Sequence, residues 1–313
     1  MALDIVPLKE QHLQDAALLV QSRYRALKQP LPMLPARWER LSEIAPLLRD
    51  LLPAGPAVAA IRDGKLVGFM MAMIIPSFLG QRTAYSPEWA NGATYVEPGR
   101  VYEEMYDRLA IQWAASGCRL HAVSLMALDA ATTAAWHWMG FGMATINAVR
   151  DVSPVEARPS SVKIRAATMT DVGTVTAFAD LLKRHLTSPP ISWQNEPYDY
   201  AQWLRAPGNV LWLAQAGGKV VGCMGVSTGN PDASLILRDD KTASIVMTYV
   251  ADRNRGQGVA GALLSNAIEA ARNSGYERCA VDFETMNTAA ARFWLKSFKA
   301  ATQTMLRWIP GQL

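Results

Sequence analysis

Cysteine and histidine are scarce in this chain, which has three cysteines and four histidines among its 313 residues. The cysteines, Cys118, Cys223 and Cys279, are odd in number, far apart and set in apolar or strand-like segments. This pattern favours buried thiols over a disulfide framework or a catalytic cysteine. Because no cysteines and histidines cluster at ligand spacing, we expect no zinc site and no other bound metal.

Long apolar runs and a strong charge imbalance are also missing. The longest apolar run, residues 66–75, ends at Pro76, well short of the roughly 20 residues that span a bilayer. The N-terminus shows no basic region followed by an apolar one, so neither a membrane segment nor a secretory signal is expected. The net charge of +4 comes from dispersed basic residues, so no nucleic-acid partner is expected. We expect a folded cytoplasmic protein, and the sequence leaves its oligomeric state open.

What the chain does contain is one order of elements that occurs twice. Apolar periodicity and turn signals predict this order in both halves, including one hairpin in each half. In the first half we expect strands at 2–6, 57–61, 66–75, 93–96, 120–128 and 143–149, and helices at 9–27, 37–51, 100–116 and 130–139. In the second half we expect strands at 162–165, 210–215, 220–226, 242–250, 278–283 and 300–308, and helices at 170–185, 198–204, 262–274 and 288–296.

Two landmarks match between the halves at nearly the same spacing. Residues 64–68 (Gly-Lys-Leu-Val-Gly) parallel residues 218–222 (Gly-Lys-Val-Val-Gly), and Asp129…Trp136 parallels Asn287…Trp294. Such a match predicts an internal duplication. We therefore expect two domains, residues 1–152 and 162–313, joined by a Pro- and Ser-containing linker at 150–161. The predicted fold class is α/β (α+β), with a mixed, mostly antiparallel sheet flanked by helices in each domain.

A glycine-rich stretch, Arg255-Gly256-Gln257-Gly258-Val259-Ala260-Gly261, lies between the strand at 242–250 and the helix at 262–274. Glycines allow a phosphate to approach the backbone, and the free N–H groups and dipole at a helix start favour negative charge. The stretch is therefore a candidate anion site. On this local pattern alone, an ordinary strand-to-helix turn is an equal alternative.

The motif Arg255-x-x-Gly258-x-Ala260, in this order of elements, resembles the pyrophosphate loop of the GNAT superfamily of acyl-CoA N-acetyltransferases. A second family motif, an Asn that opens a helix carrying an aromatic residue, is matched by Asn287-x-x-Ala290-x-x-x-Trp294. The two motifs lie on different segments, so their coincidence is more specific than either alone. The resemblance covers the second half and, more weakly, the first, and it implies two tandem GNAT-like domains.

The resemblance also implies a binding site for acetyl-CoA as co-substrate. The amides of Gly256 to Gly261 would hold the pyrophosphate beside Arg255, and the end of the preceding strand would splay and bind the pantetheine amides. One N–H there, at Val250, would polarise the thioester carbonyl. The implied coenzyme-binding residues are Thr248, Tyr249, Val250, Arg255, Gly256, Gln257, Gly258, Val259, Ala260, Gly261 and Asn287, with Phe293 or Trp294 packing against the pantetheine arm.

A base must deprotonate the attacking amine near neutral pH. Asp282 and Glu284 alternate at the end of the strand at 278–283 and share one face, opposite Phe283. Glu284 is the preferred base, acting through a water if necessary, although a solvated carboxylate at the strand end is an equal alternative. Tyr249 is a second candidate catalytic residue on the substrate side, although strand tyrosines more often pack.

The sequence departs from the family pattern in two places in the second half. Trp294 stands where many members have a tyrosine whose phenol protonates the departing thiolate, and indole is a poor proton donor. Ser297-Phe298 replaces the usual Gly-Phe after that helix.

The first half departs further from the family pattern. Its equivalent loop, residues 96–104, retains one glycine and brings in Glu97, Glu103 and Glu104, which oppose phosphate binding. We therefore expect a degenerate first domain and one coenzyme per chain.

The leading hypothesis is an acetyl-CoA-dependent N-acetyltransferase whose second domain is active. It would transfer acetyl to a primary amine of a small-molecule acceptor by direct attack. The acceptor is expected to be a small molecule because no basic stripe or extended acidic groove suggests a macromolecule. The alternative is a non-catalytic acyl-CoA-binding sensor or scaffold, which the absent phenol leaves open.

Overall fold

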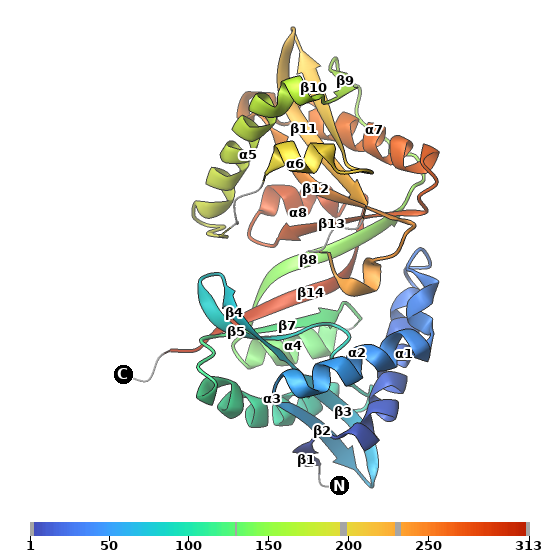
Figure 1. Cartoon of the computed structure of the whole chain (residues 1–313), viewed down its shortest axis with the longest axis vertical. Coiled ribbons are helices and arrows are strands. Elements are labelled where there is room, and N and C mark those ends of the chain that lie inside the picture. The colour runs from blue at the N-terminus through green and yellow to red at the C-terminus, as the bar shows by residue number, and fades with distance from the viewer. Residues whose placement is uncertain (1–2, 129, 195–198, 229–232, 311–313) are drawn as a thin grey trace. The chain divides into compact units, whose positions relative to one another are not determined.

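The structure is a computed structural model that describes residues 3–128, 130–194, 199–228 and 233–310 (Figure 1). Its contacts divide the chain into two compact units, each with mixed sheets and helices. Unit 1 comprises Met1–Ile146, Ser234–Ile236 and Ala300–Leu313, and unit 2 comprises Asn147–Ala233 and Leu237–Lys299. The predicted α/β class is confirmed. Among the described residues, no helix has the length and apolar character needed to cross a bilayer.

Unit 1 contains two groups of paired strands. One has the order β1-β2-β3-β6 and is antiparallel, and the other has the order β4-β5-β7-β14, in which β5 and β7 run parallel. The unit is built from β1 (Asp4–Pro7), α1 (Leu13–Lys28), α2 (Leu41–Leu51), β2 (Ala57–Arg62), β3 (Lys65–Met71), β4 (Met73–Phe78), β5 (Gln81–Ser86), β6 (Asn91–Ala93), α3 (Pro98–Ala115), β7 (Leu120–Met126), α4 (Ala130–Trp138), the start of β8 (Gly142–Asp151) and nearly all of β14 (Lys299–Trp308).

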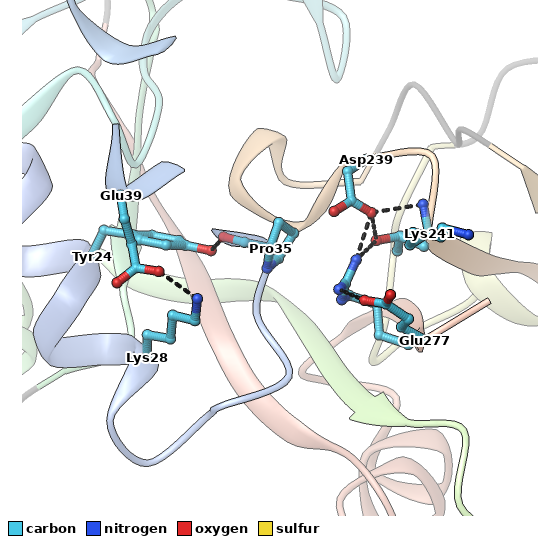
Figure 2. A network of polar contacts seen from close by, with 9 residues as sticks. Tyr24, Lys28, Pro35, Glu39, Asp239, Lys241 and Glu277 are labelled. Atoms are coloured by element: carbon cyan, nitrogen blue, oxygen red, sulfur yellow. Dashed lines mark hydrogen bonds and ion pairs between the residues drawn. The ribbon is translucent and has the colours of Figure 1, made fainter. Parts of the chain in front are cut away.

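Helices α1 and α3 cover opposite sides of the β2–β3 hairpin. A Cβ atom built at Gly68 on β3 would meet Val101 of α3, whereas one at Gly92 on β6 would meet Leu19 and Arg23 of α1. On the α1 side, Tyr24 donates a hydrogen bond to the Pro35 carbonyl at 2.6 Å, and Lys28 pairs with Glu39 (Figure 2). These contacts tie the proline-rich connection between α1 and α2 to α1.

The hairpin of β4 and β5 corrects the prediction, which treated residues 76–98 as a loop with one strand at 93–96. The turn uses Leu79 and Gly80, both with positive φ (51° and 73°), and lacks the Asn-Gly or Asp-Gly signal of common hairpins. Strand β5 is also rich in polar residues, although Thr83 and Ser86 are buried. Neither the turn nor the strand therefore carries the apolar alternation on which a sequence prediction depends.

Unit 2 has the strand order β13-β12-β11-β10-β9, with the end of β8 next to β13. Its elements are the end of β8, β9 (Lys163–Ala166), α5 (Val172–Thr187), α6 (Tyr200–Arg205), β10 (Val210–Ala216), β11 (Lys219–Thr228), β12 (Thr242–Val250), α7 (Val259–Asn273), β13 (Arg278–Glu284) and α8 (Thr288–Trp294). Cys223 packs in the core beneath α5, whereas its neighbour Gly222 faces Val259 of α7. Helices α5 and α7 therefore flank these strands on opposite sides (Figure 1).

Matched local geometries in the two units support the predicted duplication. The hairpin glycines Gly64 and Gly218 have nearly identical φ values of 74° and 75°. Gly222 allows Val259 of α7 to pack closely on β11, as Gly68 does for α3 on β3. The ring pairs Trp136–Phe141 and Trp294–Phe298 are both edge-to-face, at 4.7 and 5.5 Å. Asp129, the other landmark of the first half, lies outside the described residues.

The last strand of each half belongs partly or mostly to the other unit. Strand β14, which ends the second half, pairs antiparallel with β7 in unit 1, from Thr302↔Met126 to Trp308↔Leu120. Residues 147–151, the end of β8, belong to unit 2. Domain boundaries at 152 and 162 remain a prediction, and the compact units are not continuous in sequence.

The three cysteines are buried, free thiols, as predicted. Burial raises the pKa of Cys118 and raises the pKa values of Cys223 and Cys279 to about 12. Thiols with such pKa values stay protonated near neutral pH and are poor nucleophiles.

Candidate functional site

Strands β12 and β13 are paired at one end and separated at the other. Their parallel register runs from Thr242↔Arg278 to Ile245↔Val281 and stops there, although β12 continues to Val250 and β13 to Glu284. On its other side β12 stays paired with β11 as far as Gly222↔Val250. The carboxyl ends of these two neighbouring strands therefore leave an open edge, which is where α/β sheets bind ligands.

The closed end of the strand pair is held by a buried polar cluster. Asp239 accepts hydrogen bonds from Lys241 N and Thr242 Oγ1, both at 2.9 Å, and its Oδ1 lies 2.6 Å from Arg278 Nη1 (Figure 2). Thr242 begins β12 and Arg278 begins β13, so one carboxylate fastens the starts of both strands. Since the cluster fixes only the starts, the far ends remain free to diverge.

Backbone groups at the end of β12 point toward the open side. Ala251 N donates to Val221 O of β11 at 2.9 Å. Successive residues of a strand alternate in the side to which they direct their N–H groups. The N–H groups of Thr248 and Val250 therefore point away from β11, to the side where pairing with β13 has ended. Thr248 also has a buried Oγ1 without a hydrogen-bond partner among the described residues.

The glycine stretch forms the N-terminus of α7. Gly258 is the N-cap, with φ 79° and no side-chain cap, and the first helical hydrogen bond runs from Ala262 N to Gly258 O. Within the described parts of the chain, no hydrogen bond of standard geometry runs from the amides of residues 256–261 to an acceptor, and the turn at 255–258 is closed only weakly. A Cβ atom at Gly256 would meet nothing within 4 Å. This row of free donors, at the positive end of a 15-residue helix, is a cradle for an anion.

Arg255 is engaged with the end of β12. Its Nε donates to Val250 O at 3.1 Å, its Nη2 lies 2.9 Å from Asp252, and its guanidinium lies 5.6 Å from the centre of the Tyr249 ring. These contacts fix the Val250 carbonyl. The role of Arg255 in neutralising a diphosphate remains a prediction.

Tyr249 is buried on the α5 side of β12. Its ring lies 5.4 Å from that of Phe178, and burial, with the nearby charge of Asp252, raises its pKa. A tyrosine with a raised pKa keeps its proton, so this environment favours packing over proton abstraction. Its predicted catalytic role is not tested by these contacts.

Glu284 ends β13 at the open edge. Burial raises its pKa, which the charge of His185 opposes. Asp282 is exposed and Phe283 buried, consistent with the predicted alternation of faces. Because β12 and β13 are parallel neighbours, Glu284 and Val250 end at the same edge of the sheet. A half-buried carboxyl with a raised pKa is suited to general-base chemistry near neutral pH.

The residues predicted to contact the pantetheine arm lie on or next to α8. Asn287 caps this helix by accepting a hydrogen bond from Ala290 N at 3.3 Å, and within the described residues nothing accepts from its side-chain amide. Phe293 is half-buried. Trp294 is 5% exposed and packs between Phe293 and Phe298, so Phe293 is the more accessible of the two predicted aromatics.

These residues fit a coenzyme that carries a diphosphate and an amide-containing arm. The free amides of residues 256–261 suit the diphosphate, and the unpaired strand edge and the unpartnered Thr248 hydroxyl suit the amides. Among the described residues, no group of His, Cys, Asp and Glu side chains has an arrangement that could hold a metal ion.

The equivalent loop of unit 1 does not have this cradle. Glu97 is the N-cap of α3, in a left-handed conformation, and lies 3.3 Å from Arg62. Pro98 opens the helix and has no N–H to donate. Tyr102 is fully buried behind it and donates to Asn91 at 3.1 Å. This helix start therefore carries a carboxylate and a bulky ring and lacks one N–H donor, and these features disfavour the binding of an anion.

Comparison with known proteins defines the class. Residues 178–299 match the acetyltransferase (GNAT) family. This segment contains the separated ends of β12 and β13, the glycine stretch and α8. The chain therefore carries a domain of the GNAT family in its second half, as its two motifs predicted. No curated protein matches the chain.

Solved structures resemble the whole chain in fold. A GCN5-related glucosamine N-acetyltransferase region of a fungal multi-domain GH3 β-N-acetylglucosaminidase has 13% identity and a TM-score of 0.56, covering 98% of this chain and 38% of that one. A GCN5-related N-acetyltransferase from Sphaerobacter thermophilus has 14% identity and a TM-score of 0.55, covering 99% and 97%. This chain thus spans well under half of the fungal protein. At such identities the likeness establishes the fold alone.

One segment at the site was not anticipated from the sequence. Residues 157–160, predicted to be only part of a linker, pass against the glycine stretch: a Cβ atom at Gly258 would lie 3.3 Å from Arg158 O, and one at Gly261 would lie 3.7 Å from Ala157 Cβ. A contact between segments about a hundred residues apart leaves no local pattern, so sequence reasoning had no signal for it.

Proposed function

We propose that this chain is an acetyl-CoA-dependent N-acetyltransferase that transfers an acetyl group to a primary amine of a small-molecule acceptor by direct attack. The observation that carries this proposal is the row of free amides at residues 256–261, beside the open edge between β12 and β13. Membership of residues 178–299 in the GNAT family supports acyl transfer in general. The acetyl group, the amine and the mechanism are the proposed part.

The coenzyme supplies an acyl thioester, whose carbonyl becomes more electrophilic when its oxygen accepts a hydrogen bond. Val250 N–H is the donor that we assign to this task. Its direction is set by the β11 pairing, and Arg255 holds the carbonyl of the same residue, which belongs to the next peptide unit. A donor fixed before the reaction needs little reorganisation during it.

Glu284 is the base that we assign to the attacking amine. Its raised pKa makes it a better proton acceptor than an ordinary carboxylate, and its place at the edge shared with Val250 supports this assignment. Trp294 offers no acidic proton, so the thiolate leaves unprotonated or takes a proton from water.

Replacement of Ala260 by Glu tests the coenzyme site. This residue lies in the first turn of α7, where a carboxylate stabilises the helix by about 0.3–1 kcal/mol but repels a diphosphate. We expect Ala260→Glu to lose coenzyme A binding in isothermal titration with no fall in melting temperature. Ala260→Gln, of nearly equal size, is the control and should bind. The neighbouring Gly258 is less suitable because its φ of 79° would strain any side chain.

The same titration gives the stoichiometry, which we expect to be one coenzyme per chain because, within the described residues, unit 2 has this row of free amides and the equivalent loop of unit 1 does not. Undiminished binding by Ala260→Glu would show that the assigned loop is wrong. Two sites per chain would show that unit 1 binds as well. A thiol-release assay over a broad amine panel, amino sugars included, then tests turnover. Tight binding without release of coenzyme A for any amine would favour the sensor or scaffold alternative.

A further inference from the structure

The segment 157–160 lies against the start of α7, and this contact is the starting point for an inference about coenzyme binding. The nearest atoms to a Cβ built at Gly258 are Arg158 O at 3.3 Å, Pro159 O at 3.4 Å and Ser160 Cβ at 3.5 Å. Gly258 is the N-cap of α7, so this segment borders the row of free amides. Any anion on those amides therefore has residues 157–160 as a neighbour.

The charge at this helix start supports an anion there. Arg158 is exposed, and within the described residues its side chain makes no hydrogen bond or ion pair. Arg253 and Arg255 add positive charge on the other segment. The acidic groups of the two segments are Asp252, which is paired with Arg255, and Glu156. Free cations near the positive end of a helix are unfavourable unless an anion joins them.

Arg255 is already committed to other partners. Its guanidinium contacts Val250 O, Asp252 and the Tyr249 ring. Arg255 is the residue from which the family motif would provide a cation for phosphate, so these contacts leave it less available for that task. Coenzyme A carries a diphosphate and a 3′-phosphate, and charge-assisted hydrogen bonds from guanidinium are the strongest that a protein offers to them. Arg158, whose backbone lies next to Gly258 and whose side chain is exposed, is a second arginine that would meet this need.

We propose that residues 157–160 form a second wall of the coenzyme site and that Arg158 pairs with a phosphate of the bound coenzyme. This inference rests on the proposed function. It assigns part of the coenzyme site to the segment that joins the two halves of the chain, outside the GNAT-matched residues 178–299.

Titration of the full-length chain with coenzyme A tests the pairing. Arg158→Gln should weaken binding about tenfold, the scale of one lost charge-assisted hydrogen bond, and should lower the salt dependence of binding. Arg158→Lys should recover part of the affinity. Arg272→Gln, which removes the same charge at the other end of α7, is the matched control and should bind as the parent chain does. The melting temperatures of the two Arg158 variants should not fall below that of the parent, whereas Arg272→Gln should melt slightly lower because it removes a cation from the last turn of α7.

Dephospho-coenzyme A identifies the phosphate involved. If Arg158 pairs with the 3′-phosphate, which this ligand lacks, the parent and Arg158→Gln should bind it equally. If Arg158 pairs with the diphosphate, which this ligand keeps, the tenfold difference in affinity should remain. Both results support the pairing. Hydrogen exchange should show protection of residues 156–161 together with 256–261 when coenzyme A binds.

Equal coenzyme A affinity in Arg158→Gln and the parent would overturn the inference while leaving the proposed function intact, provided Ala260→Glu abolishes binding. Failure of the parent chain to bind coenzyme A would reject both.

Discussion

Glu284 combines two opposite dependences on pH. Burial raises its pKa, so its protonated form is favoured in the folded chain. Its contribution to folding stability is therefore complete below the pKa it has when unfolded, and is lost as pH rises through the raised pKa. The deprotonated, proton-accepting form of Glu284 appears as pH rises through the same raised pKa. The transferase activity should therefore rise over the pH range in which the contribution of Glu284 to folding stability is lost.

Glu284→Gln should remove this ascending limb from the pH profile of kcat/KM and lower kcat by roughly 10²–10⁴-fold, the usual contribution of a general base. The amide has nearly the same shape and carries no charge, so the melting temperature at neutral pH should hold or rise. The measurement is a pH–rate profile with any active amine. Asp282→Asn, which changes an exposed carboxylate on the same strand face, is the control and should retain the limb. An unchanged profile in Glu284→Gln would remove this residue from the mechanism.

At the scale of residues, the sequence predicted which residues form the candidate site better than it predicted the contacts that their side chains make. Gly258 and Asn287 could be placed because their spacing from neighbouring elements is fixed by local structure. The engagement of Arg255 with Val250 O and Tyr249 could not be predicted, because a long side chain chooses among partners through tertiary contacts. Phe293 or Trp294 was expected at the ligand, and the burial of Trp294 against Phe298 depends likewise on packing.

The strand pair β12–β13 works as an element with one fastened end and one open end. Asp239 and Arg278 form the fastening, and their side chains are only 14% and 7% exposed. Removing Arg278 leaves the Asp239 carboxylate without its cation, and breaking a buried pair in this way commonly costs about 3–5 kcal/mol. Removing Asp239 costs less, because Arg278 keeps Glu277 as a partner at 2.7 Å.

Arg278→Met should therefore destabilise unit 2 strongly, whereas Asp239→Asn with Arg278→Met should recover much of the loss because no buried carboxylate remains. Denaturant unfolding of the four proteins in the double-mutant cycle measures this coupling. Additive effects of the two substitutions would show that the cluster does not act as a unit. Coenzyme A affinity in these variants reports whether the open end depends on the closed one.

The predicted elements were most accurate where the periodicity was strong and the ends were marked. The strand at 242–250 is an example, whereas α7 begins at Val259, inside the glycine stretch and three residues before its predicted start. The β4–β5 hairpin was missed because its turn residues, Leu79 and Gly80, carry no standard signal. The end of pairing at Ile245↔Val281 was expected only through the family resemblance, because the apolar pattern of β12 does not encode where its pairing with β13 stops.

At the scale of the whole chain, the compact units share their last strands. A fragment of residues 162–313 lacks residues 147–151, which belong to unit 2, and so leaves one edge of β13 without its partner. Exposed strand edges exchange and aggregate. We expect a fragment of residues 147–313 to protect β13 from hydrogen exchange better than 162–313 does, and to remain soluble at higher concentration. Both fragments carry β14, so they differ only at the added segment. Equal protection would mean that the sequence boundary at 162 is sufficient.

The position of β14 also has a genetic consequence. A premature stop codon just after Lys299 would delete a strand of unit 1, including Met305, which is buried in the core with Trp136. The damage from a late truncation would thus fall on the half of the protein encoded first, while the glycine stretch encoded nearby would keep its own strands. Each half of the sequence contributes strand residues to the compact unit formed mainly by the other half. If the halves arose by duplication, deleting or separating either one would therefore remove strand residues from the other unit as well.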